Sequence, residues 1–464
     1  MVFSSMLFLW IFLPVTFVLS RIVRPVKLQN ILLLVMSLIF YAWGEPVYVI
    51  LLLASVFANW LLGMLTASFP AKKKFWLFLA VAVNLSLLGY YKYANFAINT
   101  VNKVFRTSIP LLDLALPIGI SFFTFQALSY VIDLYRGKYG VQKNILSLAL
   151  YISFFPQLIA GPIVRYRDVN AQIGSREITP EKTAEGIRRF IYGLGKKVLI
   201  ANVLAKAADD LYGLTAMNLT GGMAWFAAIA YTMQIYYDFS GYSDMAIGLG
   251  KMFGFDFLEN FDLPYLSKSM GEFWRRWHMS LGTWFKEYLY IPLGGNRKGE
   301  ARTCINLFIV FALTGLWHGA SWNFVAWGVY NGVLVIAERL WLSGFLKKHR
   351  IASRLYTILA FIVGWVMFRL DSFMEAFRVL GRMFGSSLGQ TMPYRLIMYV
   401  TPLEVFAMVC GILGAGVIRS VTPDRVRERF IKTPLEAVYL TLVLFMSIVF
   451  LAGNAYNPFI YFRF

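Results

Sequence analysis

The 464-residue sequence has few charged residues, three histidines and two cysteines. Charged side chains make up 15% of the chain, whereas soluble globular domains average about 25%. Hydrophobic residues make up 59%, and aromatic residues alone make up 17%. This composition excludes an ordinary soluble domain and indicates an integral membrane protein.

Several common functional motifs are also missing from the sequence. Cys304 and Cys410 both lie in apolar runs, and two isolated thiols make neither a disulfide framework nor a metal cluster. There is no Walker A or H-E-x-x-H pattern, which argues against ATP-driven transport and zinc proteases. We therefore predict no metal site and no bound cofactor.

The formal net charge of +20 would suit a nucleic-acid-binding protein, but the basic residues lie in short loops between apolar runs. That distribution is the positive-inside pattern of membrane proteins rather than a basic binding face. The sequence thus predicts the lipid bilayer as a partner and no nucleic acid.

The apolar runs have the length of membrane helices rather than of barrel strands. We expect an all-α, polytopic bundle of about ten to twelve transmembrane helices, with re-entrant and interfacial helices. Residues 1–464 should form a single membrane-embedded domain, because no soluble stretch is long enough to fold alone. The expected spans are Val2–Ser20, Leu28–Trp43, Val47–Ala67, Phe75–Ala97, Pro117–Leu134, Phe190–Ala208, Met223–Gly248, Leu355–Phe368, Leu396–Ile418 and Pro434–Ala452.

Loop charges predict the orientation of these spans. Basic residues crowd the loops at 21–27 and 72–74 but are absent from the turn at 44–46. The positive-inside rule then places the N-terminus, and by the same count the C-terminus, outside the cytoplasm. Leu146–Ile163 is apolar but broken by two prolines and has basic residues at both ends, so we expect a re-entrant segment there.

His318 lies between two apolar runs, Cys304–Trp317 and Trp322–Leu342. An ionisable side chain at membrane depth is costly and therefore indicates a functional site. A neutral imidazole near pH 7 can act as a general base that takes a proton from a hydroxyl group. The structural alternative is a histidine held by a hydrogen bond in the core.

A second histidine, His278, lies in the segment Lys251–Arg302, which is dense in charged and aromatic residues and suggests interfacial or re-entrant helices. Helical spacing would place Trp274 and His278 on one face. Arg275, Arg276 and Lys286 suit a phosphate-bearing cytoplasmic substrate such as a coenzyme. Anchoring at the membrane surface explains these cations equally well.

Two carboxylates, Asp238 and Asp244, lie within an otherwise apolar span. Buried carboxylates need partners, and one use is to orient an imidazole. Helix capping and hydrogen bonds between helices are the alternatives. The third histidine, His349, lies in a basic loop and receives no functional assignment.

Several motifs carry a family resemblance. The segment Phe273–His278, followed about forty residues later by Gly315–His318, is similar to the signature of the membrane-bound O-acyltransferase (MBOAT) family. Pro117–Gln126, Phe155–Pro162 and Tyr237–Tyr242 resemble the bacterial branch that O-acetylates polysaccharides such as alginate. The resemblance extends over essentially the whole chain and shows no departure at either histidine.

This resemblance implies a helical bundle around a central tunnel in the bacterial cytoplasmic (inner) membrane. It implies that His318 is catalytic, that His278 is the second histidine of the site, and that cytoplasmic acetyl-CoA is the acyl donor. A separate extracytoplasmic SGNH or esterase-like acetyltransferase would then acetylate a polysaccharide. The residues expected to bind substrate are Trp274, Arg275, Arg276, Trp277, Asp238, Ser240, Trp317 and Asn323.

The C-terminal stretch 457–464 is aromatic, and Pro458 prevents a helix there. We hypothesise that Tyr461 receives the acyl group with His318 as the base. The tail resembles the C-terminal tyrosine segment of a small membrane protein that accompanies D-alanyl transfer. An aromatic anchor at the membrane interface is the alternative.

Other functions remain open at the level of sequence. The related D-alanyl transfer to teichoic acid takes its acyl group from a carrier protein, and loop charges suit either donor. From a different class, a transporter or lipid-carrier flippase would also use broken helices and buried aspartates. A scaffold of a polysaccharide-modifying complex is a third possibility.

Overall fold

The computed structural model describes residues 1–386, 394–431, 433–453 and 456–460. The described residues form helices and no strand, apart from one isolated antiparallel bridge between Phe261 and Trp277. The all-α prediction is therefore confirmed. The chain divides into two compact units, residues 1–190 with 243–259 and residues 191–242 with 260–464. The boundary falls inside two helices, α10 (Pro180–Gly195) and α12 (Gly221–Met252), and the single domain stays a prediction.

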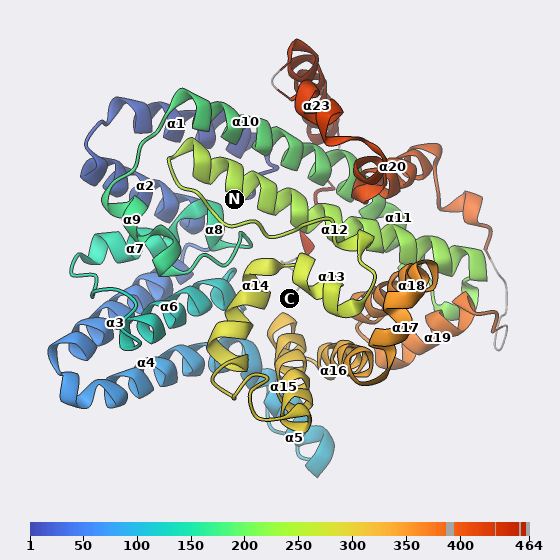
Figure 1. The fold of residues 1–464 in the computed structure, drawn as a ribbon, viewed down its shortest axis with the longest axis horizontal. Helices are drawn as coiled ribbons and strands as arrows, with labels where there is room; N and C mark the ends of the chain where they lie inside the picture. The colour runs from blue at the N-terminus through green and yellow to red at the C-terminus, as the bar shows by residue number, and fades with distance from the viewer. Residues whose placement is uncertain (387–393, 432, 454–455, 461–464) are drawn as a thin grey trace. The chain divides into compact units, whose positions relative to one another are not determined.

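The first unit consists of antiparallel apolar helices, and Figure 1 shows three of them, α3, α4 and α6, side by side. A buried amide pair joins α3 to α4, in which Asn59 and Asn84 each donate to the other's carbonyl oxygen over 3.2 and 2.7 Å. Such polar contacts hold membrane helices together where burial of apolar surface does not. Its elements are η1 (Phe8–Phe12), α1 (Leu13–Ile22), α2 (Val26–Ala42), α3 (Tyr48–Ser68), η2 (Pro70–Lys72), α4 (Lys73–Leu88), η3 (Gly89–Tyr93), α5 (Ala94–Phe105), α6 (Ile120–Tyr135), α7 (Ile145–Ser153), α8 (Phe155–Leu158) and α9 (Tyr166–Gly174).

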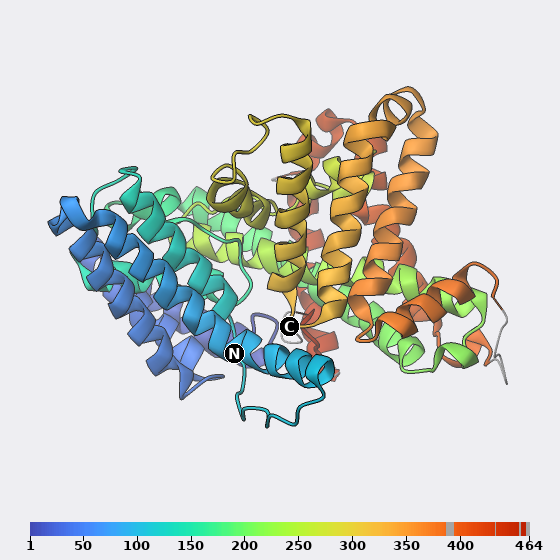
Figure 2. The same cartoon turned by 90° about the horizontal axis from the view of Figure 1, so that it is seen from below.

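The second unit contains three long helices, α15, α16 and α18, which stand side by side in Figure 2. Two glycines let α15 and α16 meet, because a Cβ atom on Gly315 would lie 2.2 Å from the carbonyl oxygen of Phe324 and 3.0 Å from the Cα of Gly328. Its elements are η4 (Lys196–Ala201), α11 (Asn202–Tyr212), η5 (Ala216–Asn218), η6 (Pro264–Leu266), α13 (Met270–Arg276), α14 (Met279–Phe285), η7 (Lys286–Tyr290), α15 (Glu300–His318), α16 (Trp322–Ala337), η8 (Glu338–Leu342), α17 (Ser343–Lys348), α18 (Arg350–Arg369), α19 (Phe373–Met383), η9 (Leu396–Met398), α20 (Pro402–Ile412), η10 (Leu413–Val417), α21 (Ile418–Val421), α22 (Asp424–Phe430) and α23 (Pro434–Gly453).

Seven helices in the described part of the chain are long and apolar enough to cross a membrane, and two shorter apolar helices precede them. The chain is thus a multi-pass membrane protein, while ten to twelve crossings and the sides of the two termini stay predictions. The break predicted within Leu146–Ile163 is present, because α7 ends at Ser153 and the four-residue α8 follows, while the re-entrant path stays a prediction.

Candidate active site

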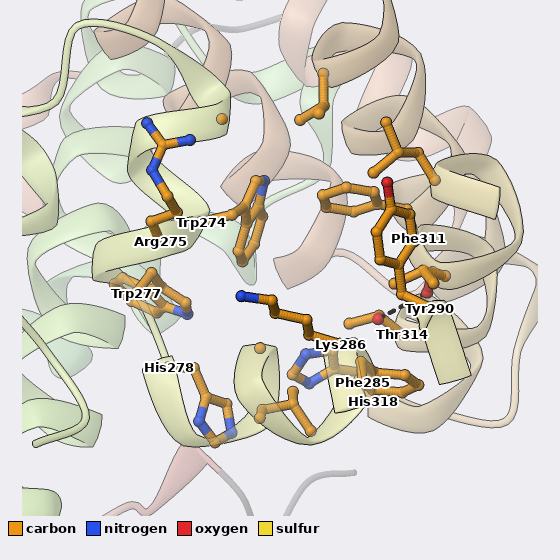
Figure 3. A pocket seen from close by; sticks show the side chains of 16 residues that line it. Trp274, Arg275, Trp277, His278, Phe285, Lys286, Tyr290, Phe311, Thr314 and His318 are labelled. Carbon is orange, nitrogen blue, oxygen red and sulfur yellow. Dashed lines mark hydrogen bonds between the residues drawn. The ribbon is translucent and has the colours of Figure 1, made fainter. Parts of the chain in front are cut away.

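Both predicted histidines line one pocket of about 300 Å³ in the second unit. Its walls come from α13, α14, η7 and α15, with Val335 of α16 closing one side. Figure 3 shows His278 and His318 at the same end of this pocket, with Trp274 and Trp277 further along. The remaining lining residues are Gly271, Arg275, Leu281, Gly282, Phe285, Lys286, Tyr290, Leu307, Val310, Phe311 and Thr314.

His318 is the last residue of α15, at the turn between the two apolar runs. Its side chain is 7% exposed and is enclosed by aromatic rings. The centroids of Trp327 and Phe368 lie 5.2 and 5.3 Å from the imidazole, both edge to face. His318 also lines a second cavity of about 10 Å³, together with Ile460 near the chain's end. His318 therefore lines both the pocket and a small cavity that Ile460 also borders.

His278 reaches the same pocket in a way that helical spacing does not explain. Helix α13 ends at Arg276, and His278 follows with a left-handed backbone (φ 46°, ψ 53°) before α14 begins. The prediction that Trp274 and His278 share one helical face is therefore wrong. The two residues nevertheless both line the pocket, because the chain turns between them.

The hydrogen bonds around His278 involve Asn260, a residue that sequence analysis did not single out. The Nδ1 atom of His278 lies 3.1 Å from Oδ1 of Asn260. The side chain of His278 is 2% exposed, and this burial lowers its pKa well below the ordinary value of 6.5, with a further lowering from His318. His278 is thus a neutral imidazole at physiological pH.

Two cations face the pocket. Figure 3 shows the Lys286 side chain running across the pocket with its ammonium group toward Trp277. Among the described residues, Lys286 forms no ion pair. Arg275 lines the pocket as well, whereas Arg276 pairs with Glu272 at 3.0 Å and Asp262 at 3.3 Å and does not line it. The two adjacent arginines therefore have different environments.

A wider basic vestibule continues from the pocket and shares Gly271, Arg275, Tyr290, Leu307 and Val335 with it. It holds about 660 Å³. Both of its carboxylates are engaged, since Glu272 pairs with Arg276 and Glu338 accepts the N–H groups of Met270 and Gly271. The vestibule thus keeps an excess of positive charge, part of which comes from the basic loop around His349. Its basic residues are Lys268, Arg275, Arg339, Lys347 and Arg350.

Four other predicted residues lie in packed surroundings. The rings of Trp317 and His278 lie 6.1 Å apart, and Asn323 donates its amide to the carbonyl oxygens of Met367 and Leu370. Ser240 is buried on α12, and Asp238 pairs with Lys197. None of the four is among the residues that line the pocket, and their contact with substrate stays a prediction.

The C-terminal segment 456–460 is held by a series of contacts within the second unit. The Asn202 amide donates to Asn457 Oδ1 over 3.0 Å, and the Lys197 ammonium donates to the carbonyl oxygen of Pro458. The N–H group of Ile460 donates to Asp238 Oδ2 over 2.8 Å. Tyr461 lies outside the described residues, so its predicted acyl-acceptor role stays a prediction.

No group of three or more His, Cys, Asp or Glu side chains that could hold a metal ion occurs within the described ranges.

Comparison with known proteins gives consistent results. The model of the membrane-bound O-acyltransferase family matches residues 140–374. The chain is 41% identical to a Pseudomonas putida protein named probable alginate O-acetylase, over 100% of both chains. It is 36% identical to the peptidoglycan O-acetyltransferase of Helicobacter pylori over 83% of this chain and 80% of the relative. It is 29% identical to the teichoic acid D-alanyltransferase of Bacillus subtilis over 53% and 65% of the two chains.

Proposed function

Since this chain belongs to the membrane-bound O-acyltransferase family, we propose that it transfers an acetyl group from cytoplasmic acetyl-CoA toward an extracytoplasmic polysaccharide. The observation that carries this proposal is the pocket that holds both histidines and opens into the basic vestibule. The names of the alginate and peptidoglycan relatives support a polysaccharide as the final acceptor. A bacterial cytoplasmic membrane and extracytoplasmic termini belong to the same proposal.

The proposed chemistry uses His318 as the general base. Its imidazole takes the proton of an acceptor hydroxyl as that oxygen attacks the thioester carbonyl carbon. A carbon–oxygen bond forms, the carbon–sulfur bond breaks, and the leaving thiolate takes the proton back from the imidazolium. The aromatic rings around His318 keep water away from the reacting carbonyl group. Water at that position would hydrolyse the thioester.

The charge of the vestibule supports a phosphate-bearing donor. Coenzyme A carries three phosphate groups at one end and the thioester at the other. Guanidinium and ammonium groups such as Arg350 and Lys347 suit phosphate. The narrower pocket would take the uncharged arm, with the acetyl group at the histidine end.

The acceptor side involves the C-terminal segment. Ile460 shares the 10 Å³ cavity with His318, and Tyr461 is the next residue in the chain. We propose that the Tyr461 hydroxyl is the first acceptor and that an SGNH or esterase-like extracytoplasmic acetyltransferase then takes the acetyl group from it.

The test uses purified protein and radiolabelled acetyl-CoA. Wild type should retain label on the protein and pass it to the partner enzyme. His318→Ala and Tyr461→Phe should not. His349→Ala is the matched control, because His349 is exposed, lines neither the pocket nor the vestibule, and should behave as wild type. Absence of label from wild type, with donor and partner supplied, would contradict the proposal.

The alternative donor is a D-alanyl carrier protein, which the similarity to the teichoic acid D-alanyltransferase favours. Supplying a D-alanyl-loaded carrier protein in the same assay decides between the two. Transfer of label from that carrier, and not from acetyl-CoA, would show that the donor is the D-alanyl carrier protein.

A further inference from the structure

We propose that Asn260, supported by Ser280, is a positioning residue that holds His278 as the Nδ1–H tautomer, so that its Nε2 lone pair accepts a hydrogen bond from a ligand in the pocket. This inference rests on the proposed function only for the identity of the ligand, an acyl donor with amide N–H groups. The tautomer itself follows from the contacts of three side chains.

The orientation of the Asn260 amide is determined by its neighbours. The backbone N–H of Ser280 lies 3.3 Å from the Oδ1 position and its hydroxyl oxygen lies 2.9 Å away. A backbone N–H can only donate, so the atom facing it has to be the amide oxygen. The flipped amide would set two donors against each other.

The tautomer of His278 then follows from that oxygen. Its Nδ1 atom lies 3.1 Å from Asn260 Oδ1, and two acceptors at this distance would repel each other, so Nδ1 carries the hydrogen. A neutral imidazole has one N–H group, and Nε2 is therefore an unprotonated acceptor. Within the described residues Nε2 is buried and has no hydrogen-bond partner.

The backbone around His278 is arranged to maintain this contact. Residues 260–262 run antiparallel to residues 276–279, with the N–H of Met279 donating to the Asn260 carbonyl oxygen over 2.9 Å and the N–H of Asp262 donating to that of Arg276 over 3.0 Å. His278 keeps a left-handed backbone that a non-glycine residue seldom adopts. Such a conformation at a pocket wall indicates a side chain whose direction matters more than local backbone preference.

Burial and the neighbouring His318 favour the neutral form of His278. His318 on α15, Arg275 on α13 and Lys286 in η7 line the same pocket, and Phe239 of α12 packs edge to face at 4.6 Å. Among the residues that the structure describes, the pocket lining includes no carboxylate. Burial and His318 disfavour an imidazolium, so Nε2 keeps its lone pair near neutral pH.

The direct test is nitrogen-15 NMR of histidine-labelled protein in lipid. Since the chain has three histidines, the variant His318→Gln/His349→Gln leaves His278 as the single imidazole. We expect one protonated and one unprotonated ring nitrogen, with Nδ1 protonated. Adding Asn260→Ala should change the ratio of the Nδ1–H tautomer to the Nε2–H tautomer. An Nε2–H tautomer or an imidazolium at neutral pH would overturn the assignment. The outcome does not depend on which acyl donor the enzyme uses.

Activity gives an independent readout. Asn260→Asp replaces a neutral acceptor by a carboxylate, and the added negative charge should raise the pKa of His278. The acid limb of the kcat/KM profile should then move to higher pH, and the activity lost at neutral pH should return as the pH rises. A folded Asn260→Asp variant whose acid limb stays at the wild-type pH would overturn the positioning role. Thermal unfolding verifies that the Asn260→Asp variant is folded. The pH profile of the His349→Gln variant serves as the reference.

Discussion

The ammonium group of Lys197 lies 2.5 Å from a carboxylate oxygen of Asp238, and the two side chains are 3% and 2% exposed. Each partner also binds the backbone of the C-terminal segment, Lys197 at the Pro458 carbonyl oxygen and Asp238 at the Ile460 N–H. An ion pair removed from water is stable only when its remaining hydrogen-bonding capacity is satisfied. This pair therefore holds the segment 458–460 beside the cavity that His318 and Ile460 line.

The first prediction concerns this pair. Lys197→Met leaves a buried carboxylate without its cation, which should cost about 3–5 kcal/mol of stability. Thermal unfolding in detergent measures the loss. The double variant Lys197→Met/Asp238→Leu removes both charges and should recover most of it.

Lys182→Met is the control for that experiment. Lys182 pairs with Asp256 at 2.9 Å, but both side chains are more than one-third exposed, at 38% and 47%. Loss of this exposed ion pair should cost at most about 1 kcal/mol of stability. Equal destabilisation by Lys182→Met and Lys197→Met would show that the buried pair has no special role.

The second prediction concerns the vestibule. Lys347→Gln and Arg350→Gln should each raise KM for acetyl-CoA about two- to fivefold, the equivalent of about 0.5–1 kcal/mol, with kcat unchanged. Lys348→Gln is the matched control, because Lys348 lies between them in sequence and does not line the vestibule. A KM change shared by all three variants would indicate a nonspecific effect of net charge.

The third prediction separates two neighbouring arginines. Arg275 lines both the pocket and the vestibule, whereas Arg276 is engaged by Glu272 and Asp262. Arg275→Gln should therefore lower kcat/KM about tenfold, as expected for a lost charge-assisted contact of about 1.4 kcal/mol. Arg276→Gln should leave kcat/KM near wild type, and initial rates at low acetyl-CoA measure both. The reverse order of effects would place the donor elsewhere.

The fourth prediction concerns the contact between α15 and α16. Gly315→Ala places a methyl group against the Phe324 carbonyl oxygen one turn before His318, and should destabilise the protein by about 1–3 kcal/mol while displacing the imidazole. Gly344→Ala is the control, since a Cβ there meets nothing within 4 Å. Thermal unfolding and activity should both fall in Gly315→Ala alone. Wild-type activity in Gly315→Ala would mean that the helices separate without moving His318.

The sequence predicted those parts of the site that depend on local patterns. His318 could be placed because apolar runs on both sides define a helix–turn–helix, and α15 ends at that residue. The lengths of the apolar runs likewise predicted the helices, since membrane helices satisfy their own backbone hydrogen bonds. These features require no knowledge of distant contacts.

What the sequence did not predict depends on residues far apart in the chain. Asn260 meets His278 only because the chain turns back between them, and the left-handed residue at His278 interrupts the helix that its spacing suggested. Asp238 was identified as a buried carboxylate, but its partner Lys197 comes from η4, 41 positions earlier in the sequence. Pairings of this kind are set by packing rather than by periodicity.

The central claim is that His318 is the catalytic base, and the most direct measurement is the initial rate of acetyl transfer by His318→Gln beside His349→Gln in the same membranes. The account predicts a loss of about 10²–10⁴-fold for His318→Gln, the range of general-base catalysis, with His349→Gln at the wild-type rate. A folded His318→Gln enzyme that transfers acetyl groups as fast as His349→Gln would contradict it.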